Sequence, residues 1–273
     1  MTGPVVLVGC GNMGRAMLEG WLAAGKLTSA QALVVEPAEA LRARAAALGA
    51  TALADASQIG ADVAPRLVVF AVKPQVVLDI VPAYARFRDG ATFVSVAAGT
   101  PIAAFERLLG AGAAVIRCMP NTPAAIGKGM MVTVANAHVA QAAAAFVRDL
   151  LSASGRVAEI ADEGLMDAVT AVSGSGPAYV FHFIECLTAA GEAAGLPADT
   201  ARLLAMQTVY GAAALATESG EEPGELRRQV TSPNGTTAAA LSVLMGDDRL
   251  KTLVAEAVEA ARRRSVELGR PPA

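Results

Sequence analysis

A glycine-rich turn between two apolar runs is the feature that most restricts the fold of this chain. Val5 to Val8 form a continuous apolar run, typical of a strand buried on both faces. Gly9-Cys10-Gly11-Asn12-Met13-Gly14 follows at once, and Arg15 to Ala24 read as a helix that ends at Gly25. In a G-x-G-x-x-G turn, the first glycine permits a tight turn, the second lets the backbone approach a pyrophosphate, and the third allows close helix–strand packing. Because the motif lies between a strand and a helix, it predicts a dinucleotide-binding site.

An acidic residue, Glu36, ends the second apolar run, Ala32 to Val35. An acid about 20 residues beyond the glycines can accept a hydrogen bond from the adenosine ribose, which favours NAD(H). The alternative for Glu36 is an exposed strand end. Arg42 and Arg44 follow on a predicted helix and could meet the 2′-phosphate of NADP(H), although a solvated helix face explains them as well. These residues leave the choice of cofactor open.

Later apolar runs predict further strands of an open parallel sheet. They are Leu67 to Val72, Thr92 to Ala97, Val115 to Cys118, Met130 to Ala135 and Arg156 to Ile160, with a helix over Val139 to Leu151. The first three runs end in small-residue or proline turns. Ligands of open α/β sheets bind beyond the carboxyl ends of the strands. We therefore expect these turns to line the cofactor groove.

Strand patterns stop after Asp162, and only helical patterns follow. The predicted helices are Leu165 to Val172, Ala178 to Ala194, Asp199 to Glu218, Glu222 to Val230, Thr236 to Met245 and Asp247 to Leu268. We therefore expect two domains, residues 1–161 and residues 162–273. The helices carry too many apolar faces for a small bundle on its own, so we expect at least a homodimer.

Two loops in the helical half have the composition of an anion site. In Val169 to Phe181, Ser175 is a candidate N-cap and Pro177 suits the first turn of the helix that follows. Thr231 to Thr237 is a second loop of this kind. A Gly/Ser loop at a helix start exposes backbone N–H groups that suit a carboxylate, although most such loops are only caps.

Composition excludes several classes of function. The net charge of −3 argues against nucleic-acid binding, and no run of apolar residues is long enough to span a membrane. The start of the chain does not resemble a signal peptide. The three cysteines lack a CxxC pair and only two histidines are present, so we expect no disulfides, no metal site and a reducing, cytoplasmic location.

Several motifs together resemble the pyrroline-5-carboxylate reductases, the enzymes of the last step of proline biosynthesis. The similarity covers nearly the whole chain. It rests on Val8 to Gly14, Ala71 to Pro74, Arg117 to Pro123, Asp167 to Tyr179, and Pro223 to Leu226 with Ser232 to Thr237. The last two stretches are specific to the family rather than general features of Rossmann proteins.

The resemblance implies an α/β fold, with an N-terminal Rossmann-like dinucleotide-binding domain followed by an all-α dimerisation domain, often assembled into a decamer. It implies reduction of 1-pyrroline-5-carboxylate to L-proline by NADPH or NADH. Thr237 matches the catalytic threonine that hydrogen-bonds the ring nitrogen. Residues implied to contact the substrate are Ser173, Gly174, Ser175, Gly176, Gly235, Thr236 and Glu163. Residues implied to contact the cofactor are Val8, Gly9, Cys10, Gly11, Asn12, Met13, Gly14, Glu36, Ala71, Val72, Lys73, Pro74, Ala97 and Ala98.

The chain departs from the family pattern at two positions. Asn234 stands where the family usually has glycine, and asparagine tolerates positive φ best among the other residues. Glu36 stands where many members that prefer NADPH carry small or basic residues. The resemblance therefore favours NADPH, whereas Glu36 favours NADH.

The scarcity of histidine suits the reduction of a cyclic imine. The imine nitrogen arrives protonated, so the enzyme mainly brings the reactants together and holds the carboxylate. A neutral hydroxyl, that of Thr237, then suffices to orient the nitrogen, although a helix cap is the alternative reading of this residue.

Three other functions stay open at this point. Another cyclic imine carboxylate differs by one methylene, which changes discrimination by only about 1–3 kcal/mol. β-Hydroxyacid dehydrogenases resemble one another in using a lysine on an early helix of the second domain. This chain has no lysine between Lys128 and Lys251, which counts against that function. A regulatory protein without catalysis would have no reason to keep both carboxylate loops.

Overall fold

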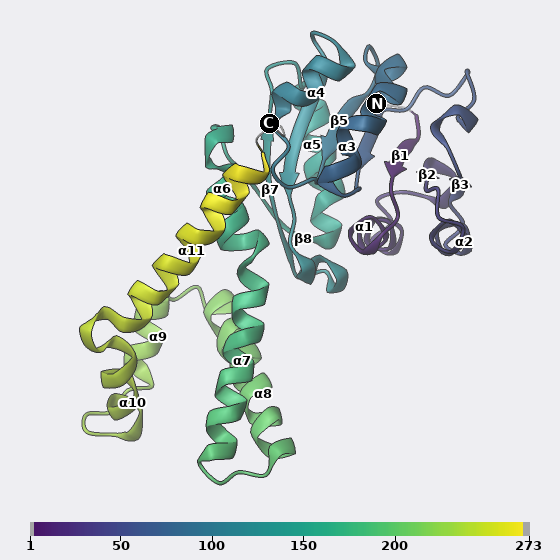
Figure 1. Cartoon of the computed structure of the whole chain (residues 1–273). Helices are drawn as coiled ribbons and strands as arrows, with labels where there is room; N and C mark the ends of the chain where they lie inside the picture. The colour runs from purple at the N-terminus through teal and green to yellow at the C-terminus, as the bar shows by residue number, and fades with distance from the viewer. Residues whose placement is uncertain (1–2, 270–273) are drawn as a thin grey trace. The chain divides into compact units, whose positions relative to one another are not determined.

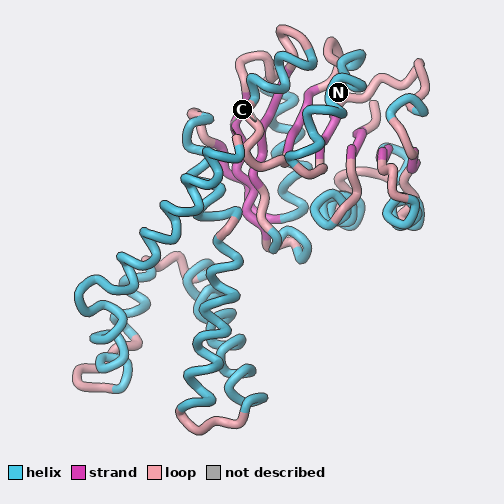
Figure 2. Tube along the Cα trace, viewed as in Figure 1, coloured by secondary structure: helices cyan, strands magenta, loops and turns pink. Residues whose placement is uncertain are grey.

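The computed structural model describes residues 3–269 of the chain (Figures 1 and 2). The chain divides into two compact units. Unit 1 holds the residues up to Ser175 together with those from Ala261 onward, and unit 2 is Gly176–Ala260. The domain boundary predicted near residue 162 marks the change from strand patterns to helical patterns along the sequence. It is not the same boundary as the division after Ser175, and it stays a prediction.

Unit 1 is built on one sheet of eight strands in the order β3-β2-β1-β4-β5-β6-β7-β8. The strands are β1 (Val5–Val8), β2 (Ala32–Val35), β3 (Thr51–Leu53), β4 (Leu67–Phe70), β5 (Thr92–Ser95), β6 (Ala114–Met119), β7 (Gly129–Ala135) and β8 (Gly155–Glu159). Every neighbouring pair is parallel except β6 and β7, which pair antiparallel. This confirms the predicted sheet and brings the carboxyl ends of β1, β2, β4, β5 and β6 to one edge.

Helices cover both faces of the sheet, which explains the continuous apolar runs. Along β1, Val5 and Leu7 belong to one core cluster, and Val6 and Val8 belong to the other. The first cluster contains side chains of α1 (Asn12–Ala23) and α5 (Gln141–Leu151), and the second contains side chains of α3 (Pro74–Ile80) and α4 (Ile102–Leu109). Burying one such side chain contributes about 1.5–3 kcal/mol to the free energy of folding, so these side chains stabilise the strands within the sheet.

The short edge strand β3 was not predicted from the sequence. Thr51 is exposed and the other two residues are only half-buried, so the segment lacks the apolar run of the inner strands. It pairs with β2 and is followed along the chain by β4. The helix α2 (Glu39–Ala47) connects β2 to β3. The helix α1 begins at Asn12, inside the glycine motif, rather than at Arg15.

Short helical segments complete unit 1 after β8. They are a 3₁₀ turn (Glu163–Leu165), α6 (Met166–Val169) and a π-helical turn (Thr170–Gly174). Unit 2 contains α7 (Gly176–Ala193), α8 (Ala198–Glu218), α9 (Pro223–Gln229) and α10 (Thr236–Met245). The last helix, α11 (Arg249–Leu268), begins in unit 2, and its final turns belong to unit 1.

Unit 2 lacks a core of its own. The helices α7 and α8 lie side by side (Figure 1), yet Ala201 and Ala205 are the only buried residues in this unit, all of which the structure describes. Large apolar side chains are exposed instead, among them Phe181, Leu203, Tyr210, Val243 and Leu253. Such a surface is typical of a helical unit that buries its apolar faces against another copy. No helix within residues 3–269 is long and apolar enough to cross a membrane.

Candidate active site

The glycine turn between β1 and α1 has the geometry of a pyrophosphate cradle. Gly9 has φ +90°, and a Cβ on Gly14 would lie 2.2 Å from the Gly9 carbonyl oxygen. These two glycines are therefore required by the turn and by helix–strand packing. A Cβ on Gly11 would meet no atom within 4 Å outside the adjoining residues. The space beside Gly11 is free for a ligand, at the N-terminus of α1, where backbone N–H groups favour phosphate. The turn therefore fits a dinucleotide.

Glu36 lies at the carboxyl end of β2 and is only 6% exposed. Its Oε2 accepts a hydrogen bond from the backbone N–H of Cys10 at 2.7 Å, and its Oε1 accepts one from the N–H of Ala38 at 2.9 Å. The alternative of an exposed strand end is therefore wrong, because these two donors compensate the burial of the carboxylate. The acid adjoins the glycine turn, where the ribose of a dinucleotide would lie.

The two arginines after Glu36 differ in their surroundings. One terminal nitrogen of Arg42 donates to the carbonyl oxygens of Glu36, at 2.9 Å, and Pro37, at 2.8 Å. Arg42 therefore stabilises the turn before α2 rather than forming only a solvated face. Arg44 is exposed on α2.

The turn after β4 lies beside the glycine turn. The N–H of Ala71 donates to the carbonyl of Val8 at 2.8 Å, and a Cβ on Gly9 would lie 2.6 Å from Val72 Cγ1. Lys73 is the N-cap residue of α3, and Pro74 is its first residue. The structure thus brings together Gly9 and the Ala71–Pro74 segment at the edge where the sheet was expected to bind its cofactor.

The turn after β5 is also held from within. Ala97 is buried, and its N–H donates to Ser95 Oγ at 3.2 Å. Ala98 follows at the carboxyl end of β5. Thr100 is buried, and Pro101 is the N-cap residue of α4. This predicted cofactor segment is therefore a fixed element of unit 1.

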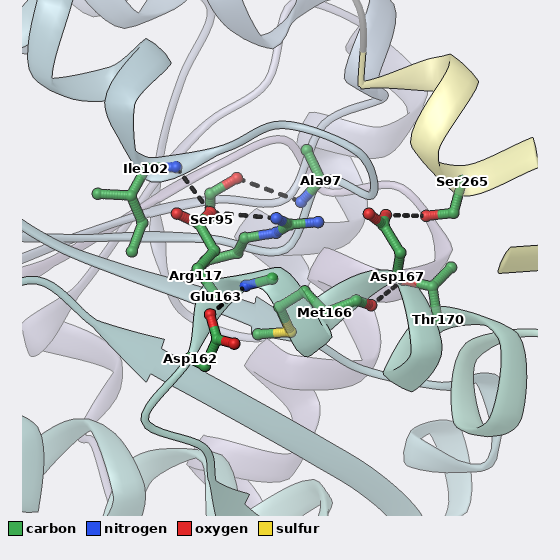
Figure 3. A network of polar contacts seen from close by, with 11 residues as sticks. Ser95, Ala97, Ile102, Arg117, Asp162, Glu163, Met166, Asp167, Thr170 and Ser265 are labelled. Carbon is green, nitrogen blue, oxygen red and sulfur yellow. Dashed lines mark hydrogen bonds and ion pairs between the residues drawn. The ribbon is translucent and has the colours of Figure 1, made fainter. Parts of the chain in front are cut away.

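A partly buried ion pair links β6 to the chain beyond β8 (Figure 3). Arg117 on β6 is 7% exposed, and its Nη1 lies 3.1 Å from Oε1 of Glu163. The same oxygen accepts a hydrogen bond from the N–H of Ile102 at 2.9 Å. Glu163 thus compensates the charge of Arg117 and fixes the first residue of α4. The family resemblance places Glu163 near the substrate, but the sequence analysis did not predict its ion pair with Arg117. The one signal for such a pair is that Arg117 is a charged residue within a buried strand.

The Val169–Gly176 stretch is not the loop that its composition suggested. Thr170–Gly174 forms a π-helical turn, and the N–H of Ser175 donates to the carbonyl of Thr170 at 2.8 Å. Ser175 has right-handed helical backbone angles, so the prediction that it is an N-cap is wrong. In a π-helical turn each hydrogen bond spans five residues instead of the four of an α-helix, and such turns are frequent at functional sites. The backbone therefore stays helical at Ser175, where an N-cap would leave the helix. Ser173, Gly174 and Ser175 are in unit 1, and Gly176 is the first residue of α7.

The second predicted loop is a true helix start in unit 2. Asn234 has φ 58°, so asparagine does adopt the left-handed conformation at this position. Gly235 is the N-cap of α10, and Thr236 and Thr237 are its first two residues. Thr237 is therefore not the cap of a helix, and the alternative interpretation of this residue is wrong. The first N–H groups of α10 have no partner within the helix and can bind an anion.

The thiol in the glycine turn is not activated. Burial, followed by the charge of Glu36, raises the pKa of Cys10 above its ordinary value. Burial raises the pKa of Cys118 to about 12. Among residues 3–269, no group of His, Cys, Asp and Glu side chains has the arrangement of a metal site.

Comparison with known proteins identifies relatives of the whole chain. A family model described as pyrroline-5-carboxylate reductase dimerisation matches residues 163–268, and one described as coenzyme F420-dependent NADP oxidoreductase matches residues 4–99. The chain is 42% identical to the pyrroline-5-carboxylate reductase of Pseudomonas aeruginosa, over 97% of this chain and 96% of that protein. It is 39% identical to the enzyme of that name from Synechocystis, over 97% of both chains.

Solved structures agree with this result. A pyrroline-5-carboxylate reductase from Coxiella burnetii matches with a TM-score of 0.93 and 31% identity, over 99% of this chain and 100% of that chain. The Plasmodium falciparum enzyme with NADP bound matches with a TM-score of 0.85 and 28% identity, over 98% and 99% of the two chains. The chain therefore belongs to the pyrroline-5-carboxylate reductase family.

Proposed function

We propose that the chain reduces 1-pyrroline-5-carboxylate to L-proline with a nicotinamide dinucleotide as the hydride donor. The full-length similarity to pyrroline-5-carboxylate reductases carries this proposal. A β-hydroxyacid dehydrogenase activity is disfavoured by the same similarity. Reduction of a six-membered cyclic imine carboxylate is the second candidate, since one methylene changes discrimination by only about 1–3 kcal/mol.

The chemistry asks little of the protein beyond binding and orientation. When bound, a nicotinamide would supply the hydride. The carbon of the C=N bond accepts it, because the imine nitrogen is protonated. In our proposal the hydroxyl of Thr237 accepts the hydrogen bond of the imine N–H and fixes the ring. In unit 2, the exposed N–H groups at the start of α10 are proposed to hold the carboxylate. In unit 1, Ser173 is a further proposed contact of the substrate. Proximity and orientation of this kind can remove about 7–11 kcal/mol of a reaction barrier.

The contacts proposed for substrate and cofactor are those that the family resemblance implies. The proposed substrate contacts are Ser173, Gly174, Ser175, Gly176, Gly235 and Thr236 beside Thr237, and Glu163 supports the site through Arg117 and Ile102. The proposed cofactor contacts are Val8 to Gly14, Glu36, Ala71 to Pro74, Ala97 and Ala98.

For the cofactor we propose a preference for NADH. Glu36 is buried beside the glycine turn, and its charge would lie close to the 2′-phosphate of NADPH. Arg42 donates to two backbone carbonyl oxygens, so the guanidinium that could offset this repulsion is already engaged. Like charges at short range disfavour binding by several-fold even at high effective dielectric constant.

The chain self-associates through its helical half, and we propose dimers that assemble into a decamer. The exposed apolar side chains of unit 2 supply the surface for this association. The absence of a nucleic-acid partner, the absence of a membrane partner and the cytoplasmic location stay predictions from composition.

The test follows oxidation of NADH and NADPH spectrophotometrically, with and without 1-pyrroline-5-carboxylate. We expect substrate-dependent oxidation, faster with NADH than with NADPH at equal concentration. Thr237→Ala should lower kcat by about ten- to a hundredfold with unchanged NADH affinity, and Thr237→Ser should retain most activity. Ser242→Ala, an exposed hydroxyl on the same helix, is the matched control and should behave as wild type. Absence of substrate-dependent oxidation by a folded protein that binds NADH would reject the reaction.

A further inference from the structure

Asn121 connects the turn after β6 to the predicted carboxylate site. It follows Met119 and Pro120 and is the N-cap residue of a 3₁₀ turn, Thr122–Ile126. Its Nδ2 donates to the carbonyl oxygen of Ser173 at 3.2 Å and to Ser173 Oγ at 3.4 Å. Its Oδ1 accepts a hydrogen bond from the backbone N–H of Met130 at 2.8 Å. One amide thus joins three segments of unit 1.

The orientation of this amide is fixed by its partners. The N–H of Met130 can only donate, so the oxygen of the Asn121 amide must face it. The NH₂ group is then directed to Ser173, whose carbonyl can only accept. A flipped amide would place a donor against a donor and an acceptor against an acceptor. Asn121 is therefore a rigid donor toward Ser173.

The Ser173 carbonyl needs this donor because of the sequence that follows. In an α-helix, a carbonyl accepts from the N–H four residues later. Four residues after Ser173 the chain has Pro177, which carries no N–H. The π-helical turn over Thr170–Gly174 lies at this break in the hydrogen-bond ladder. Asn121 supplies the donor that the proline lacks and so stabilises the turn.

The second contact acts on the hydroxyl of Ser173. A serine hydroxyl has one hydrogen to donate and two lone pairs. When Oγ accepts from the Asn121 amide, its own hydrogen is left to donate elsewhere. A substrate carboxylate is the partner that such a donor suits, since hydrogen bonds to ionised groups are the stronger ones.

We propose that Asn121 is a positioning residue of the substrate carboxylate site. It holds the Ser173 carbonyl in the π-helical turn and directs the Ser173 hydroxyl hydrogen to the carboxylate of the substrate. The inference rests on the proposed function, because it assumes that Ser173 binds that carboxylate. Asn121 itself need not touch the substrate.

The matched control is Asn136, which has the same kind of contacts at the other end of β6 and β7. Its Oδ1 accepts from the N–H groups of Val115 at 3.1 Å and His138 at 3.3 Å. Its Nδ2 donates to the carbonyl of Ala113 at 2.8 Å and to the carboxylate of Glu106 at 2.7 Å. Both asparagines are half-buried. Asn121→Ala and Asn136→Ala both remove an amide that joins backbone groups, and Asn136→Ala also removes a hydrogen bond to Glu106. Only Asn121→Ala is predicted to affect the substrate.

The experiment measures KM and kcat for 1-pyrroline-5-carboxylate, NADH affinity and urea unfolding in both variants. Asn121→Ala should raise KM about tenfold, the loss of one hydrogen bond to a charged group, with kcat and NADH affinity within about twofold of wild type. Asn136→Ala should lose at least as much stability, because it also removes a hydrogen bond to Glu106, with unchanged KM. In a Ser173→Ala background, the effect of Asn121→Ala on KM should fall to about twofold or less.

Asn121→Asp replaces Asn121→Ala if that variant does not fold. It keeps the acceptor for the N–H of Met130, and it should raise KM more than tenfold.

Three results would overturn the inference while the wild type turns over the substrate. They are an unchanged KM in the Asn121 variant, an equal rise in KM in Asn136→Ala, and a full effect that persists in the Ser173→Ala background. Wild-type activity is measured first. A wild type that binds NADH without oxidising it in the presence of substrate overturns the proposed function and this inference together.

Discussion

The carboxylate of Glu36 accepts a hydrogen bond from the backbone N–H of Cys10 over 2.7 Å, which joins the end of β2 to the turn after β1. One side chain therefore shapes the glycine turn and sets the charge beside it. In this arrangement, the residue that stabilises the turn is also the one proposed to select the dinucleotide.

Replacing Glu36 by glutamine should shift the cofactor preference toward NADPH. The variant removes the negative charge and keeps one oxygen that can accept from Cys10, but it loses the acceptor for the N–H of Ala38 and should therefore be less stable. We expect KM for NADPH to fall about tenfold, equivalent to about 1.4 kcal/mol. Steady-state kinetics with both cofactors measure the ratio. Glu39→Gln, an exposed acid in the first turn of α2, makes the same charge change nearby and should leave the ratio unchanged. Equal ratios in Glu36→Gln and wild type would show that Glu36 does not select the cofactor.

Two glycines of the same turn should respond differently to alanine. A Cβ on Gly11 meets no atom within 4 Å outside the adjoining residues, so Gly11→Ala should lose only the preference of an N-cap for glycine, less than about 1 kcal/mol. It should weaken NADH binding more than tenfold, because the methyl group blocks the pyrophosphate. A Cβ on Gly14 would lie 2.2 Å from a backbone oxygen, so Gly14→Ala should cost more than about 2 kcal/mol of unfolding free energy. Urea unfolding and NADH fluorescence titration separate the two effects. Unchanged NADH affinity in Gly11→Ala, or in the larger Gly11→Val, would remove this turn from the cofactor site.

The apolar strands and the glycine turn were predictable because their causes are local. A run such as Val5–Val8 has no polar side to expose, and the three roles in the glycine motif follow from backbone geometry. The observed strands begin and end within about two residues of the prediction, which is the usual accuracy at element ends. The strand β3 was missed since it has three residues and an exposed threonine.

The predictions that failed depend on partners far away in the sequence. The stretch around Ser173 has the glycine and serine content of a loop, but its backbone stays helical, with Asn121, 52 residues earlier, supplying a donor. The exposed strand end, which was only the alternative for Glu36, fails for the same reason, because its carboxylate accepts from the N–H of Cys10, 26 residues earlier. Local composition carries no signal for such contacts.

Stability should fall in alkaline solution through the buried thiol of Cys118. Burial raises the pKa of Cys118 from its ordinary value of 9.0 to about 12, because the thiolate is poorly solvated within the sheet. The unfolded thiol ionises first, so this contribution is fully present below pH 9.0 and is lost as pH rises toward about 12. Urea midpoints measured from neutral pH to above pH 9.0 should decline less steeply in Cys118→Ala than in wild type. The exposed Cys186 supplies the control, since Cys186→Ala should decline as wild type does.

The last helix should contribute to the stability of unit 1 through one hydrogen bond. Ser265 on α11 is 4% exposed, and its Oγ donates to Oδ1 of Asp167 on α6 at 2.6 Å (Figure 3). Ser265→Ala leaves a half-buried carboxylate without this donor, so the unfolding free energy should fall by about 1.5–3 kcal/mol. Urea unfolding at one fixed protein concentration measures this loss, because self-association makes stability depend on concentration. Ser242→Ala, which removes an exposed hydroxyl, should change stability by less than about 0.5 kcal/mol, and an equal loss in both variants would contradict the assignment.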